Sequence, residues 1–132
     1  MKFYDTNGHE HKIDVRPSRW PKKDIGEGRG KFQSEVGDIL AETFPGHYVL
    51  EEFPCLGERL FLDFYVPSKK IAVEVQGTQH HKFNPFFHKD KKAFATQQAN
   101  DRRKEQWCNI NDITLIKINW GASKENVLKA LG

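Results

Sequence analysis

Two carboxylates stand inside apolar segments, where charged side chains are unusual. Asp63 lies within the apolar run 60–66, and Glu74 lies within the run 71–76, after a short turn. Ionised carboxylates are rarely found in apolar strands unless a partner or a cation neutralises them. Two of them on adjacent strands would also repel each other unless a cation lay between them. We therefore predict that Asp63 and Glu74 share a divalent cation, and Mg²⁺ is the natural candidate because it takes oxygen ligands.

Turn residues and hydrophobic periodicity predict the elements that position these acids. Asn7-Gly8 indicates a hairpin over 3–15, whereas prolines, glycines and many charges mark 16–30 as a loop or arm. The spacing of apolar residues predicts a helix over 31–44. The elements expected after this helix are strands over 47–53, 60–66 and 71–76, a helix over 90–108, a strand over 113–118 and a short helix from the Ser123 cap to Leu131.

The predicted order after the arm is helix, three strands, helix, strand, helix. This order indicates an α/β fold in which helices flank a mixed central sheet. We divide the chain into an N-terminal hairpin and basic arm over 1–30 and a single domain over 31–132. The central strands carry Asp63 and Glu74, and Glu35 on the first helix is a third acid that can approach them.

Size and composition favour one compact domain. The chain has 132 residues, of which 37% are hydrophobic and 12% aromatic, so it can bury a core and does not resemble a disordered chain. No apolar run reaches transmembrane length and the polar N-terminus lacks the features of a signal peptide. We therefore expect a cytoplasmic protein that does not contact a membrane. Cys55 and Cys108 are far apart in sequence, which indicates two reduced thiols.

The net charge of +3 is small, but the cations are clustered in two stretches, over 16–31 and 82–104. Such clusters suit the backbone of a polyanion, although two solvated surfaces explain them equally well. Aromatic rings among the cations of the second stretch could stack on bases or cover the core. The candidate nucleic-acid contacts are Arg29, Lys31, Lys82, Phe83, Lys89, Lys91, Lys92, Arg102 and Arg103.

The order of elements, together with the acids, resembles the PD-(D/E)XK nuclease superfamily, which has a restriction-endonuclease-like αβββαβ core. Asp63 matches the strand Asp of that family, Glu74-Val75-Gln76 stands at its (D/E)-X-K motif, and Glu35 matches its helix acid. The resemblance implies a Mg²⁺-dependent endonuclease that cleaves DNA, with Mn²⁺ as a substitute metal.

The downstream sequence is similar to one branch of this superfamily, which contains very-short-patch repair endonucleases and EDxHD homing endonucleases. The residues that carry this similarity are Gly77-Thr78-Gln79-His80-His81, Asn100-Asp101-Arg102-Arg103 and Trp107. In that branch a Glu, an Asp, a His and a late Asp supply the chemistry. Glu35, Asp63, His80 or His81, and Asp101 match them in order.

The resemblance also implies roles at the metal. Asp63 would bind the ion directly, the Val75 carbonyl would be a second ligand, and Glu74 would bind directly or through water. The Lys of the family motif is replaced by Gln76, which cannot act as a cationic water activator. The identity of the general base therefore stays open.

A histidine is the expected acid or base, because imidazole titrates near neutral pH. His80 and His81 leave a strand side by side and face different ways, so only one of them is expected to act. Asp101 would orient that imidazole through a hydrogen bond, unless it is a helix-surface acid paired with Arg102 or Lys104.

The leading hypothesis is a DNA endonuclease that cuts or nicks phosphodiester bonds with metal-activated water. One alternative is a structure-selective nuclease such as a Holliday junction resolvase, and another is a catalytically inert nucleic-acid-binding module. A domain of this size has little surface for reading a long DNA site. A homodimer, an accessory DNA-binding partner or the N-terminal arm would then supply specificity.

Overall fold

The computed structural model describes residues 1–15, 31–76 and 91–132. A short hairpin opens the chain, with β1 over Lys2–Tyr4 and β2 over Glu10–Lys12. The remaining elements are listed here in chain order: α1 Lys31–Thr43, β3 Leu50–Cys55, β4 Leu60–Val66, the 3₁₀ turn η1 Pro67–Lys69, β5 Ile71–Gln76, α2 Lys91–Ile110, β6 Thr114–Asn119 and α3 Lys124–Leu131.

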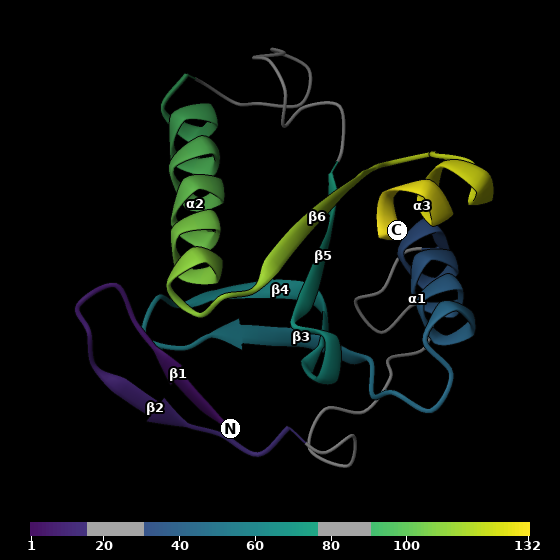
Figure 1. The fold of residues 1–132 in the computed structure, drawn as a ribbon. Helices are drawn as coiled ribbons and strands as arrows, with labels where there is room; N and C mark the ends of the chain where they lie inside the picture. Colours follow the sequence, from purple (N-terminus) through teal and green to yellow (C-terminus); the bar gives the residue numbers. More distant parts are fainter. Residues whose placement is uncertain (16–30, 77–90) are drawn as a thin grey trace.

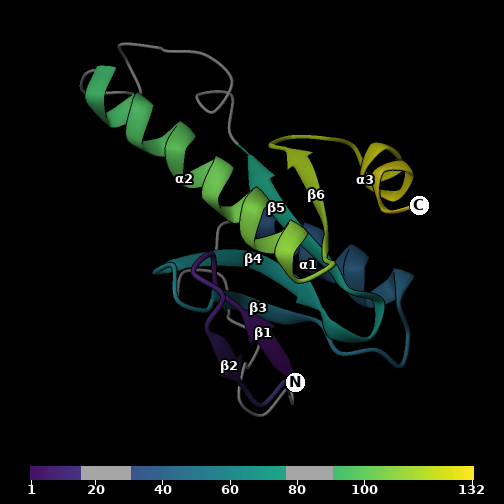
Figure 2. The ribbon, with the colours of Figure 1, turned by 60° about the vertical axis from the view of Figure 1, so that its left-hand side comes forward.

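The four longer strands form one mixed sheet in the order β3-β4-β5-β6. β3, β4 and β5 pair antiparallel in succession, whereas β6 runs parallel to β5. The helix α2 lies on one face of this sheet, and α1 and α3 lie together on the other (Figure 1). Figure 2 shows that the N-terminal half of α2 projects past the carboxyl ends of β5 and β6.

Each face of the sheet buries its own apolar cluster. α1 contributes Val36, Ile39 and Leu40, which share one helical face and pack with Phe64 and Val73 of the sheet. On the other face four aromatic rings meet, from Phe3, Phe53, Tyr65 and Trp107. Because Phe3 belongs to the hairpin, this second cluster attaches the N-terminus to the domain.

The predicted α/β order is confirmed, and the element boundaries shift by a few residues. The N-terminal hairpin is present, and the Ser123 side chain accepts a hydrogen bond from the Asn126 N–H at 3.2 Å, as a cap of α3. Among the apolar residues of α2, Trp107 and Cys108 are buried, whereas Ala93 and Ala95 are exposed. The reason is that the first turns of α2 extend beyond the sheet.

The alternation of side chains breaks in the middle of β3 and β4. Glu51 pairs with Phe64 and Phe53 pairs with Leu62, so Glu52 and Asp63 face each other between these pairs. Glu52 has a left-handed backbone, with φ of 48°, which turns the strand so that Leu50 and Phe53 both reach the α2 core. On β4, Leu62 and Tyr65 likewise face that core. Asp63 is thereby left with its side chain directed along the sheet.

Candidate metal and catalytic site

Asp63 lies where β4 and β5 separate. The ladder between these strands ends at the pair Phe64 and Val73, so the next residues in register are Asp63 and Glu74. At this point the Val75 N–H donates to Asp63 Oδ2 at 2.7 Å, which replaces a ladder hydrogen bond by a bond to a carboxylate. The backbone of β5 therefore fixes the position of the Asp63 side chain.

Glu74 is an acid buried beside another acid. Its exposed fraction is 9%. Burial, together with the charge and hydrogen bonding of Asp63, raises the pKa of Glu74 to about 8, although Lys104 acts in the opposite direction. Near neutral pH the two carboxyl groups therefore retain a proton unless another cation takes its place. The structure thus brings Asp63 and Glu74 together, as the sequence predicted.

Lys104 of α2 is the residue that sequence reasoning missed as a member of the site. Its Nζ lies 2.8 Å from Glu74 Oε1, and its side chain is only 20% exposed. Although burial alone would lower the pKa of Lys104, the nearby Glu74 and Asp63 raise it on balance. A signal was present, because Lys104 stands three and four residues before Trp107 and Cys108, the buried face of α2.

The short distance between Lys104 Nζ and Glu74 Oε1 does not by itself give Glu74 Oε1 a hydrogen bond. The contact is an ion pair, and the buried Glu74 Oε1 has no hydrogen-bond partner of good geometry among the residues that the structure describes. A buried carboxylate oxygen without a hydrogen bond is costly, which indicates that this atom is available to a further ligand.

A cavity of about 20 Å³ adjoins Glu74, enough for one water molecule or ion. Its wall combines the carboxyl end of β5 and the first half of β6 with one face of α2. The lining residues are Glu74, Val75, Gln76, Asp101, Lys104, Leu115 and Lys117. Four residues predicted for the site thus lie around a single cavity: Glu74, Val75, Gln76 and Asp101.

Glu35 does not line the cavity beside Glu74. It is exposed on α1 and lines a separate hollow of about 260 Å³, together with Phe32, Asp38 and Ala122. This hollow is on the face of the sheet opposite α2. The expected approach of Glu35 to the acid pair is not seen, because α1 packs its apolar stripe on the sheet and turns Glu35 outward.

The predicted nucleic-acid contacts divide into three groups. Lys31, Lys91, Lys92 and Arg102 are exposed. Arg103 is committed to an ion pair, in which its Nη2 lies 3.2 Å from Glu58 Oε2 and also donates to the Glu58 carbonyl at 2.9 Å. The predictions that concern Arg29, His80, His81, Lys82, Phe83 and Lys89 lie outside the described residues.

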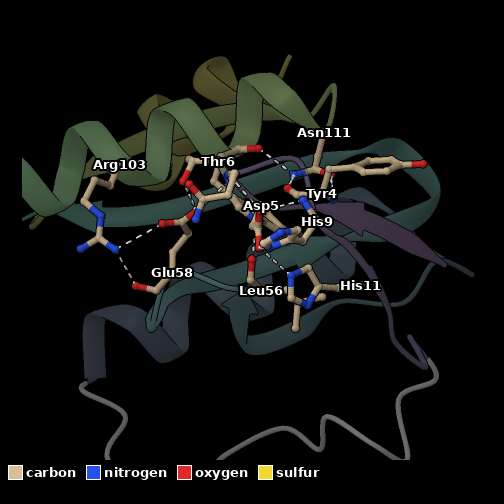
Figure 3. A network of polar contacts seen from close by, with 11 residues as sticks. Tyr4, Asp5, Thr6, His9, His11, Leu56, Glu58, Arg103 and Asn111 are labelled. Atoms are coloured by element: carbon tan, nitrogen blue, oxygen red, sulfur yellow. Dashed lines mark hydrogen bonds and ion pairs between the residues drawn. The ribbon is translucent and has the colours of Figure 1, made fainter.

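The Glu58 carboxylate ties three parts of the chain together (Figure 3). Besides Arg103 of α2, it accepts hydrogen bonds from the Thr6 N–H at 2.9 Å and the Thr6 hydroxyl at 2.7 Å. Burial alone would raise the pKa of Glu58, but the bonds from Thr6 and Arg103 lower it on balance. Arg103 therefore has a structural role that the sequence did not indicate.

The acidic side chains around the cavity are few. Within residues 1–15, 31–76 and 91–132 no group of three or more His, Cys, Asp and Glu side chains is arranged to hold one. Asp63 and Glu74 form a pair of carboxylates, and Mg²⁺ can be bound by one or two carboxylates while it keeps several waters. The orphaned oxygen of Glu74 and the adjoining cavity fit such an ion.

Comparisons with known proteins identify viral relatives. Over 78 residues the chain is 44% identical to the uncharacterized protein 307L of Invertebrate iridescent virus 6, which covers 55% of this chain and 40% of that protein. Over 65 residues it is 38% identical to the uncharacterized protein 033L of Invertebrate iridescent virus 3, which covers 49% of this chain and 34% of that protein. The alignments therefore span less than half the length of these relatives.

No family model and no solved structure matches the chain. No helix in the described parts of the chain is both long enough and apolar enough to span a membrane. The function therefore has to be argued from the site.

Proposed function

We propose that this protein is a Mg²⁺-dependent DNA endonuclease with a restriction-endonuclease-like fold. The single observation that carries the proposal is the buried acid pair Asp63 and Glu74, with an oxygen of Glu74 that lacks a hydrogen bond beside an ion-sized cavity. The order α1-β3-β4-β5-α2-β6 agrees with the αβββαβ core of the PD-(D/E)XK superfamily. The exposed cations of α2 provide a surface for phosphates.

Asp63 and Glu74 would hold the metal ion, with the Val75 carbonyl as a further ligand. When bound, Mg²⁺ supplies a nucleophilic water and neutralises charge on the phosphate. Glu74 releases its proton when it binds a cation, because its carboxylate is then neutralised. The Lys104 ammonium shifts from Glu74 to the phosphate, where it stabilises developing negative charge. Gln76 and Asp101, which line the same cavity, orient water by hydrogen bonds.

Cleavage of a supercoiled plasmid tests the proposal. Wild type should relax or linearise the plasmid with Mg²⁺ and leave it intact with EDTA. Asp63→Asn should abolish cleavage, because the amide can still accept the Val75 N–H but no longer binds the metal as an anion. Glu125→Gln is a matched control, since Glu125 is a highly exposed acid on α3, and it should cleave as wild type does.

Two results would contradict the nuclease. One is full activity in folded Asp63→Asn protein, and the other is the absence of cleavage by wild type on plain duplex, mismatched duplex and four-way junction alike. Comparison of these three substrates also separates a sequence-reading enzyme from a structure-selective one.

The ion pair between Lys104 and Glu74 favours a second candidate, a nucleic-acid-binding module without catalysis. The Lys104 ammonium lies 2.8 Å from Glu74 and places a positive charge beside the acid pair without any metal. Titration of Mg²⁺ by calorimetry discriminates between the nuclease and the inert module. The inert module would not bind Mg²⁺ at millimolar concentration, with or without DNA.

The variant Lys104→Met makes this comparison sharper. In a nuclease the loss of the competing ammonium should tighten Mg²⁺ binding, while cleavage falls roughly 10²–10³-fold, the usual effect of removing one transition-state donor. An inert module would show neither effect. A cleavage rate equal to that of wild type would remove Lys104 from the chemistry and leave it as a counter-ion.

A further inference from the structure

An exposed tryptophan stands at the same edge of the sheet as the acid pair. Trp120 is 66% exposed. Its backbone N–H donates to the Gln76 carbonyl at 2.6 Å, directly after the last paired residues of β5 and β6. Gln76 lines the cavity beside Glu74, which lies two residues earlier on β5. Because Trp120 follows three residues after Lys117, the partner of Glu74 in register, it lies about 10 Å from Glu74 along the strand direction, at roughly 3.3 Å per residue, and its ring is on the α1 side of the sheet.

Phe32 supports the indole from the side of α1. The two ring centroids are 5.9 Å apart and the rings are inclined by 57°. Behind Trp120 the chain turns at Gly121, whose φ is 84°, and Ala122 packs against the α1 core. Trp120 is thus anchored at its backbone and along one side, while most of its ring surface remains open to a ligand.

The charges around the two rings indicate which part of a nucleic acid can approach. On the α1 side the hollow next to Phe32 is lined by three acids, Glu35, Asp38 and Glu42. The lysine that lines the same hollow, Lys124, forms an ion pair with Glu42 at 3.1 Å. These acids repel phosphates. On the other side the cavity wall carries Lys104 and Lys117, which form ion pairs with Glu74 and Glu105. In the proposed function the phosphate lies at the metal ion that Asp63 and Glu74 would hold, so the part of the strand that reaches Trp120, next to the acids of α1, would be an uncharged base.

We propose that Trp120, with Phe32 behind it, is a stacking platform for a nucleobase of the DNA strand whose phosphate lies at Asp63 and Glu74. This inference rests on the proposed function and specifies its substrate. The separation of about 10 Å corresponds to about three nucleotides at 3.4 Å each. Bases within a duplex have both faces covered by their neighbours, so the ring selects DNA with an unpaired or extruded base near the cleaved bond.

Binding without cleavage provides the first test. Fluorescence anisotropy is measured in EDTA with a labelled single-stranded oligonucleotide and with a duplex that carries an unpaired base. Trp120→Ala should weaken binding of both about 5- to 150-fold, the range found when one stacked base is lost. Trp120→Phe should restore most of the affinity, because a smaller ring still stacks. Tyr48→Ala is the control, since Tyr48 is 53% exposed but lies beside Pro67 and Ser68, and it should bind as wild type.

An abasic scan locates the stacked base. One abasic nucleotide is moved through the oligonucleotide, position by position. Wild type should lose affinity when the abasic nucleotide occupies one or two particular positions. At those positions Trp120→Ala should bind the abasic oligonucleotide as well as it binds the intact one. Equal binding by wild type and Trp120→Ala, or an equal abasic penalty in both, would overturn the inference. Circular dichroism of each variant confirms folding, which substitution of an exposed side chain should preserve.

The two proposals can fail separately. Mg²⁺-dependent cleavage with no effect of Trp120→Ala on binding would refute the platform and leave the nuclease standing. Stacking at Trp120 without cleavage by wild type would refute the nuclease and retain the platform as part of a binding module.

Discussion

At the scale of single residues, the position of one proton is central to this site. Glu74 is buried next to Asp63, and these surroundings raise its pKa to about 8. Two carboxyl groups in such contact retain a proton near neutral pH even though the Lys104 ammonium lies beside Glu74, unless a further cation takes the place of the proton. Metal binding should therefore compete with both a proton and an ammonium group.

The first consequence is a pH dependence of metal affinity. Below about pH 8 Glu74 carries a proton that Mg²⁺ or Mn²⁺ has to displace, so the apparent affinity should rise about tenfold per pH unit from pH 6 to 8 and level off above. Calorimetry in buffers of different ionisation enthalpy should show close to one proton released per metal at pH 6 and almost none at pH 9. Glu74→Gln should flatten this profile, and an unchanged affinity between pH 6 and 9 in wild type would contradict the shared proton.

At the scale of elements, the site depends on how α2 is held against the sheet. The N-terminal hairpin contributes to this: Phe3 stacks on Trp107 with centroids 5.4 Å apart, and Asn111 exchanges two hydrogen bonds with the Tyr4 backbone. The Glu58 network adds a polar clamp between the hairpin, the turn after β3 and α2. The hairpin thus belongs to the structural support of Lys104, although it contributes no residue to the cavity.

Removal of the clamp should cost stability. Glu58→Ala eliminates hydrogen bonds from Thr6 and Arg103 to a charged acceptor that is only 6% exposed, and we expect a loss of about 2–3 kcal/mol in the free energy of unfolding. Because the folded-state pKa of Glu58 is below its ordinary value of 4.5, this stabilisation is present above that pH and is lost as the pH falls further. Urea denaturation at pH 7 measures the effect, and Glu125→Ala, at an exposed position, should change it by less than about 0.5 kcal/mol.

A loss from Glu58→Ala no greater than that of the control would show that the Glu58 contacts do not hold α2. Partial loss of DNA cleavage in Glu58→Ala, with unchanged behaviour of the control, would agree with the clamp as a support of Lys104.

At the scale of the whole molecule, charge and shape are arranged around one edge of the sheet. The apolar clusters on the two faces are closed by helices. The cavity lies at the end of β5 with Lys104 of α2 beside it, and Trp120 follows directly after β6. The first turns of α2 project past this edge, and they carry exposed Lys91 and Lys92. A polyanion that reaches the cavity would run along these turns.

This arrangement predicts a defined salt dependence of DNA binding. If Lys91, Lys92 and Arg102 each contact a phosphate, their joint replacement by Ala should reduce the slope of log affinity against log salt by about 2.7, at roughly 0.9 per contact. Anisotropy between 50 and 200 mM salt measures the slope. Lys129→Ala, on the exposed face of α3, should leave the slope unchanged. A triple variant with the slope of wild type would remove this face of α2 from the interface.

The sequence by itself determined the elements and their order. Turn residues, the Ser123 cap and the apolar spacing of α1 act within a few residues, so hairpin, helices and strands could be predicted from local physics. The neighbouring positions of Asp63 and Glu74 could also be predicted, because a short turn between two apolar strands leaves antiparallel pairing as the simple solution.

Only the tertiary structure decided which other groups join the acid pair. Lys104 and Glu58 are distant in sequence from their partners, and contacts of this kind depend on how α2 is rotated against the sheet. That rotation is fixed by Trp107, Cys108 and the hairpin together. For the same reason Glu35 could not be placed in advance: burial of the apolar stripe of α1 turns it away from the acids, and this follows from packing across the whole sheet.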